Sequence, residues 1–272
     1  MRAKIAAPAL LLALVLVGVC RPVEPTAESI VAEARRVHGS ALLDTAAVRF
    51  AFRGDCYGVT RDDGRLHVER VYRDTVRGEF GPYWLTLRDR YGPDGISREL
   101  AREHRTVRLS EREAQGIVTQ LNSVAYFALL PYNLTDPSVR LRRLPDDTIR
   151  GQPYQSVEVT FSQEGGGRDW QDRFVYWFHR DRHTLDYLAY HYHTDGGGTR
   201  FRVATHPRVI RGVQWQDYEN YTDSTLGTRI EAYPSRLGAS TLQRVSDVQL
   251  KHVEVGDNPQ SLLAWCVDRH RW

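Results

Sequence analysis

Two histidines separated by one tyrosine, His191 and His193, have the spacing of a metal site. In a strand, residues i and i+2 point to the same face, so both imidazoles can reach one ion. Asp195 would be a third ligand if the strand continued that far, and His179 and His183 flank the preceding turn. The alternative is that these polar side chains are only solvated at a strand end. We keep His191 and His193 as metal candidates and expect no cofactor.

A second candidate for chemistry is the group of carboxylates Glu164, Asp169 and Asp172. Paired carboxylates can hydrolyse glycans or bind calcium, but Asp169 also fits a turn after three glycines, and Asp172 can pair with an arginine. Neither a G-x-S-x-G nor an H-E-x-x-H motif occurs, and P-loop, C-x-x-C and dinucleotide-binding patterns are absent too. We assign no catalytic residue and expect a non-enzymatic protein. The alternative is an envelope hydrolase acting on glycan or lipid through Asp169, Asp172 or the two histidines, or a metal-dependent enzyme.

Aromatic residues are abundant, with 14 Tyr, 8 Phe and 6 Trp. Several lie in segments with the alternation of strands, and an apolar ligand needs a lining of this kind. The alternative is ordinary core packing. The residues that we predict to line a ligand cavity are Trp84, Trp177, Tyr190, Phe201, Trp215 and Tyr218.

The N-terminal segment has the pattern of an export signal. Arg2 and Lys4 precede the uncharged run Ile5–Val19, which is shorter than the roughly 20 residues that span a bilayer. The run ends at Cys20 and resembles the cleavage box of bacterial lipoproteins, although Val19 replaces the usual small residue. That resemblance implies a signal peptide over residues 1–19, lipidation of Cys20, a tether over residues 20–25 and anchoring in a membrane. The alternative is an ordinary exported protein with an incidental cysteine.

Two further cysteines, Cys56 and Cys266, lie near the two ends of the folded region. Export to an oxidising compartment permits a disulfide between them, which would stabilise the fold by roughly 5 kcal/mol. The alternative is two buried free thiols.

The formal charge of +3, from 37 basic and 34 acidic residues, lacks the surplus of positive charge that general nucleic-acid binding requires.

The periodicity predicts two helices and many strands. Thr26 caps a helix that runs to about His38, and Ser110 with Glu113 forms a capping box for a second helix that Pro131 ends. After Gly151 nearly all segments alternate as strands with short turns between them, which favours an antiparallel meander. We therefore predict an α+β fold, with a large curled antiparallel sheet (a half-barrel) wrapped over two helices. Residues 26–272 are expected to form one domain.

This order of elements resembles the lipoprotein-carrier fold of LolA and LolB. A second resemblance, to an uncharacterised lipoprotein family of Gram-negative bacteria, rests on short stretches between about residues 120 and 221, among them residues 121–127, 130–134, 164–167, 198–202 and 217–221.

The two resemblances support the fold and the location in the cell envelope. From the leader that ends at Cys20 and the aromatic-rich strands over helices, we expect a non-enzymatic periplasmic protein, anchored on the outer membrane, that binds a hydrophobic small molecule or lipid in a cavity of the half-barrel. A third possibility is a purely structural envelope lipoprotein that docks a protein partner.

Overall fold

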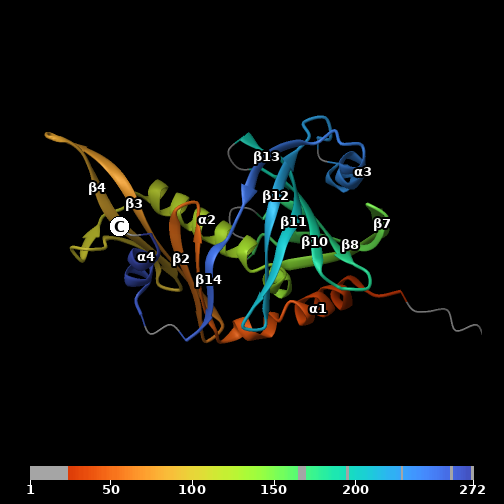
Figure 1. Ribbon diagram of the computed structural model, residues 1–272, viewed down its shortest axis with the longest axis horizontal. Coiled ribbons are helices and arrows are strands. Elements are labelled where there is room, and N and C mark those ends of the chain that lie inside the picture. The colour runs from red at the N-terminus through yellow and green to blue at the C-terminus, as the bar shows by residue number, and fades with distance from the viewer. Residues whose placement is uncertain (1–23, 165–169, 194–195, 228, 258–259, 271–272) are drawn as a thin grey trace, which may run out of the picture.

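In the computed structural model the described residues are 24–164, 170–193, 196–227, 229–257 and 260–270, and they form two seven-stranded antiparallel sheets (Figure 1). The first sheet has the order β14-β1-β2-β3-β4-β5-β6, with strands at β1 Ala47–Phe52, β2 Asp55–Asp62, β3 Arg65–Gly78, β4 Gly81–Gly92, β5 Gly95–Leu100, β6 Arg105–Val107 and β14 Lys251–Gly256. The second has the order β13-β12-β11-β10-β9-β8-β7, with strands at β7 Val139–Ile149, β8 Gln152–Phe161, β9 Arg173–His179, β10 Leu185–Tyr192, β11 Gly198–Ile210, β12 Val213–Thr222 and β13 Gln243–Val248.

The two sheets are joined where β13 ends at Val248 and β14 begins at Lys251, so the chain passes from the edge of one sheet to the edge of the other. The predicted class, α+β with a curled antiparallel surface over helices, is confirmed. The broad sheet expected from the sequence is divided into two halves, and consecutive strands within each half are hydrogen-bonded neighbours. Short hairpins favour this arrangement.

Both predicted helices are present. Helix α1, Ala27–Val37, begins at Thr26, whose side chain accepts from the backbone N of Ser29 at 3.2 Å. Helix α2, Glu111–Ala128, begins with the predicted capping box of Ser110 and Glu113. The Thr26 cap and the capping box of α2 both satisfy backbone N–H groups that the first helical turn leaves without a partner.

The two helices bury their apolar faces against different halves of the concave surface. Ile30, Val31 and Ala34 of α1 pack into a core with the strands of the second sheet. Ile117 and Leu121 of α2 pack into a core formed mainly with the first sheet. Helix α2 runs from the first sheet toward the second, and both sheets therefore contact the space beside it (Figure 1).

The outer face of the second sheet is also covered. In β9, Phe174, Tyr176 and Phe178 face the α1 core, while Trp177 faces the opposite side. There the short turn η5, Ile230–Ala232, and α3, Tyr233–Gly238, pack over it. Aromatic residues on both faces of these strands are therefore explained by two cores.

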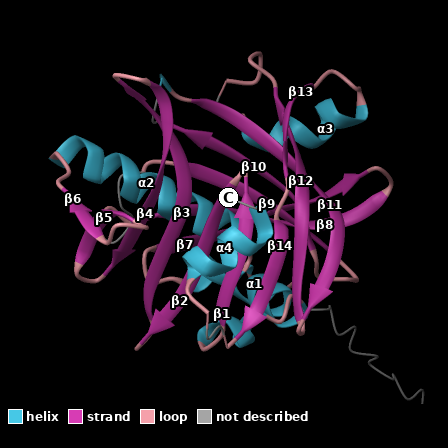
Figure 2. Ribbon diagram, turned by 60° about the vertical axis from the view of Figure 1, so that its left-hand side comes forward, coloured by secondary structure: helices cyan, strands magenta, loops and turns pink. Residues whose placement is uncertain are grey.

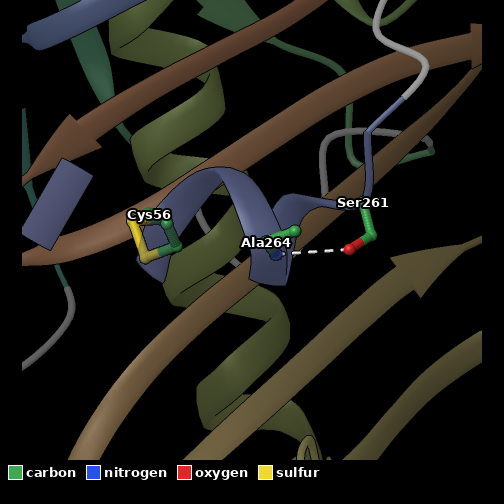
Figure 3. The surroundings of a disulfide bond; sticks show 4 residues. Cys56, Ser261 and Ala264 are labelled. Atoms are coloured by element: carbon green, nitrogen blue, oxygen red, sulfur yellow. Dashed lines mark hydrogen bonds between the residues drawn. A yellow bond between two sulfur atoms is a disulfide. The ribbon is translucent and has the colours of Figure 1, made fainter. Parts of the chain in front are cut away.

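A disulfide joins Cys56 of β2 to Cys266 of α4, Leu262–His270, with 5.9 Å between the two Cα atoms (Figure 3). The first turn of α4 begins with a hydrogen bond from Ala264 N to Ser261 Oγ at 3.2 Å. Both cysteines are fully buried with Trp265 in a small apolar cluster, which holds α4 across β2 and β3 (Figure 2). The bond closes a loop of 210 residues.

One buried histidine makes stability sensitive to mild acid. His38 is 2% exposed, and its Nε2 accepts a hydrogen bond from the backbone N of Leu185 at 3.1 Å. Burial lowers the pKa of His38 to about 4, against a weak opposing effect of Asp186. The folded protein thus keeps His38 neutral, whereas the unfolded chain takes up a proton near its usual pKa of 6.5.

We expect this histidine to lower the free energy of unfolding as pH falls, by about 3 kcal/mol between pH 6.5 and 4. Above that window the stabilisation is complete. Urea denaturation at a series of pH values measures the effect, with His38→Gln as the control, since glutamine retains a hydrogen-bond acceptor but does not titrate. Parallel stability profiles for the two proteins would contradict the assignment.

Candidate functional site: a cavity between α2 and the second sheet

A cavity of about 1030 Å³ opens between α2 and the concave face of the second sheet. Small-molecule sites in proteins are typically about 300–1,000 Å³, so this space is large enough for a lipid chain. Its lining comes from α2 and from strands of both sheets: Tyr91, Ile96, Ala114, Gln115, Gly116, Val118, Thr119, Gln120, Asn122, Ser123, Tyr126, Phe127, Phe161, Asp172, Phe174, Tyr190, Tyr192, Arg200 and Arg202.

The hollow exists because one side of α2 carries small residues. Gly116, Thr119 and Ser123 recur at helical spacing and line the cavity. A Cβ atom placed on Gly116 would meet no heavy atom within 4 Å. Since glycine inside a helix costs about 1 kcal/mol relative to alanine, this face is adapted to leave room rather than to strengthen the helix.

Another part of the lining, the aromatic wall, combines Phe127 from the last turn of α2 with Phe174 and Tyr190 of the second sheet. Phe174 stacks on Tyr190 with 5.4 Å between ring centroids, and Phe127 lies 5.2 Å from the same tyrosine ring. The hydroxyls of Tyr126 and Tyr176 are 2.8 Å apart and hydrogen-bonded. Burial raises the pKa of Tyr126 still further above the neutral range, so its hydroxyl stays protonated. Aromatic rings of this kind are suited to contact with an apolar ligand.

Three charged residues also border the cavity. Arg200 and Arg202 come from β11, and Asp172 from the residue before β9. The carboxylate of Asp172 accepts a hydrogen bond from the backbone N of His193 at 3.1 Å. Arg200 donates to the backbone O of Thr199 at 2.8 Å.

A second hollow of about 980 Å³ adjoins the first and shares Tyr91, Asn122, Tyr126 and Phe161 with it. Its remaining lining is more polar and includes Arg61 of β2.

The six aromatic residues predicted to bind a ligand occupy different environments. Tyr190 lines the cavity. Trp177 and Phe201 pack in the outer core under α3, Trp215 packs in the core of α2, and Tyr218 packs in the core of α1. Trp84 is 58% exposed on β4, with the Arg73 guanidinium 4.8 Å from its ring.

Several lining residues were not predicted, among them Phe127, Phe174 and Arg202. A signal was available, because alternation places Phe174 and Tyr176 on one strand face and Arg200 and Arg202 on another. The sequence did not show that these faces lie opposite the small-residue side of α2.

Three of the candidates for metal binding and catalysis, His191, His193 and Asp172, lie close together where β10 ends and β9 begins. The rings of His191 and His193 are 4.6 Å apart, and Nδ1 of His193 lies 3.3 Å from Asp172. Glu164 is exposed in a turn, while Asp169, Asp195 and Cys20 lie outside the described residues.

Within the described ranges, the group of three ligand atoms close enough for one ion comes from Cys56, Cys266 and His270, and the disulfide occupies both thiols.

The helices of the described chain include none long and apolar enough to cross a membrane.

Fold and cavity together define an α+β half-barrel with a large, mostly apolar hollow under its concave face. The chain belongs to a family of unknown function, DUF6503, whose model matches residues 96–249. The matched segment contains α2 and all of the second sheet, and hence most of the cavity lining. This confirms the predicted membership in an uncharacterised family. Comparison with curated proteins finds no match.

Solved structures with a similar arrangement include a LolA superfamily protein from Nitrosomonas europaea, 12% identical, with a TM-score of 0.45 over 87% of this chain and 96% of that one. A DUF1329 family protein from Desulfovibrio piger is also 12% identical, with a TM-score of 0.44 over 88% and 96%. An outer membrane lipoprotein-sorting protein domain from Vibrio parahaemolyticus is 8% identical, with a TM-score of 0.42 over 85% and 95%. These scores describe a shared layout and carry no information about the ligand.

Proposed function

We propose that this protein is a lipid-anchored envelope protein that binds a hydrophobic molecule, such as an acyl chain, without catalysing a reaction. The observation that carries the proposal is the cavity of about 1030 Å³, which is lined by small residues of α2 and by aromatic rings from α2 and the second sheet. Burial of each methylene of an acyl chain in such a site contributes about 0.8 kcal/mol.

The proposed location is the periplasmic side of the outer membrane, with the anchor on Cys20. The export pattern of residues 1–19 and the lipoprotein-like cysteine that follows it support this location. The disulfide between Cys56 and Cys266 also supports it, because such bonds persist in exported proteins.

Two measurements test the proposal. Native mass spectrometry of gently purified protein, followed by organic extraction, should release a lipid in amounts comparable to the protein. The delipidated protein should then bind the neutral fluorescent probe phenylnaphthylamine, and hexadecanol should displace it. A protein that yields no lipid and takes up neither molecule would not be a carrier of apolar ligands.

A further inference from the structure

Arg202 is a buried cation that has no carboxylate partner within the described part of the chain. Arg202 is 8% exposed and lines the cavity. Among the described residues no carboxylate oxygen lies within 4.0 Å of the Arg202 guanidinium, and its Nε and Nη1 atoms are buried without a hydrogen-bond partner. Other buried arginines are compensated: Arg70 pairs with Asp89 at 2.6 Å, and Arg88 pairs with Glu99 at 2.6 Å.

The surroundings hold the Arg202 guanidinium in place without neutralising it. Its Nη2 donates to the hydroxyl of Tyr190 at 3.1 Å. The guanidinium carbon lies 3.8 Å from the centroid of the Phe127 ring and 5.4 Å from that of Tyr190. Contacts with aromatic faces stabilise a cation but leave its charge uncompensated. Unsatisfied donors and an unpaired charge in a protein interior are unfavourable unless another group satisfies them.

We propose that the bound molecule is an amphiphile with an anionic head group, a carboxylate or a phosphate, and that Arg202 pairs with that head group. This proposal rests on the proposed function. Arginine suits this role because its planar donors match both anions. Arg200, on the same face of β11 and also lining the cavity, adds a second positive charge. The apolar chain of the ligand then lies along the aromatic wall.

The experiment compares three probes with the same chain length: palmitate, hexadecyl phosphate and hexadecanol. The affinity of each probe for the wild-type protein and for the Arg202→Met variant is measured by displacement of phenylnaphthylamine. We expect at least one anion to bind the wild type about tenfold or more tightly than hexadecanol, as for hydrogen bonds to charged groups. Arg202→Met should remove that preference and leave hexadecanol within about twofold of its wild-type affinity. Preference for palmitate indicates a fatty acid, and preference for hexadecyl phosphate indicates a phosphate head group.

Two controls separate the roles of charge and fold. Arg77→Met removes an exposed arginine of β3 and should change no affinity, and Arg202→Lys should retain part of the preference for anions. As a measurement that needs no variant, palmitate labelled at its carboxyl carbon should keep the NMR shift of the ionised form to lower pH when bound than in detergent.

The outcomes distinguish the two proposals. Equal affinities for all three probes, or a preference that survives Arg202→Met, would overturn the role of Arg202 and leave the apolar site standing. Failure of every probe to bind, hexadecanol included, would overturn both proposals.

Discussion

The double variant Thr119→Trp, Ser123→Trp is expected to bind hexadecanol on the order of 100-fold more weakly than the wild-type protein does. The two residues lie one helical turn apart on α2 and both line the cavity, so two indoles would occupy the space that we assign to the ligand chain. Displacing about four methylenes costs about 3 kcal/mol, which corresponds to that loss of affinity. Displacement of phenylnaphthylamine measures it.

The matched control is Thr119→Ala with Ser123→Ala, which alters the same two positions and enlarges the hollow. It should bind hexadecanol at least as well as the wild type, and circular dichroism should show that both variants keep the wild-type fold. If the tryptophan variant is folded and binds hexadecanol normally, the ligand chain does not lie beside this face of α2.

Removal of the disulfide should lower the free energy of unfolding by more than the protonation of His38 does. In the double variant Cys56→Ala, Cys266→Ala, the unfolded chain is released from a closed loop of 210 residues, which costs roughly 5 kcal/mol in the chain-entropy model. For a domain of this size that corresponds to a fall in Tm of about 10–20 °C. Calorimetry measures the shift directly.

Reduction of the wild-type protein with dithiothreitol should lower its Tm by a similar amount and leave the double variant unchanged. Cavity binding should persist in the variant below its Tm, because α4 packs on β2 and β3 of the first sheet, away from the aromatic wall. A Tm within 3 °C of the wild-type value would correspond to a loss of less than about 1.5 kcal/mol in the free energy of unfolding. That result would show that opening the loop adds little conformational entropy to the unfolded chain.

Local signals in the sequence determined the elements of this protein. Capping by Thr26 and the box of Ser110 and Glu113 act over three residues, so they identified both long helices from the chain alone. Alternating residues likewise identified the strands and the antiparallel class. The division into two sheets could not be predicted from local signals, because it depends on a two-residue connection between β13 and β14 and on pairing between β14 and β1, which are far apart in sequence.

Tertiary structure alone decided which side chains meet. Trp177 and Tyr190 have similar sequence signals, but strand parity directs one into the outer core and the other into the cavity, and only the positions of α2 and α3 show which face is hollow. Likewise, Arg202 stands in an ordinary alternating strand, and its lack of a carboxylate becomes visible only when every neighbour from α2, β10 and β12 is in place. Burial and unpaired charge are properties of long-range packing, which no local pattern of residues records.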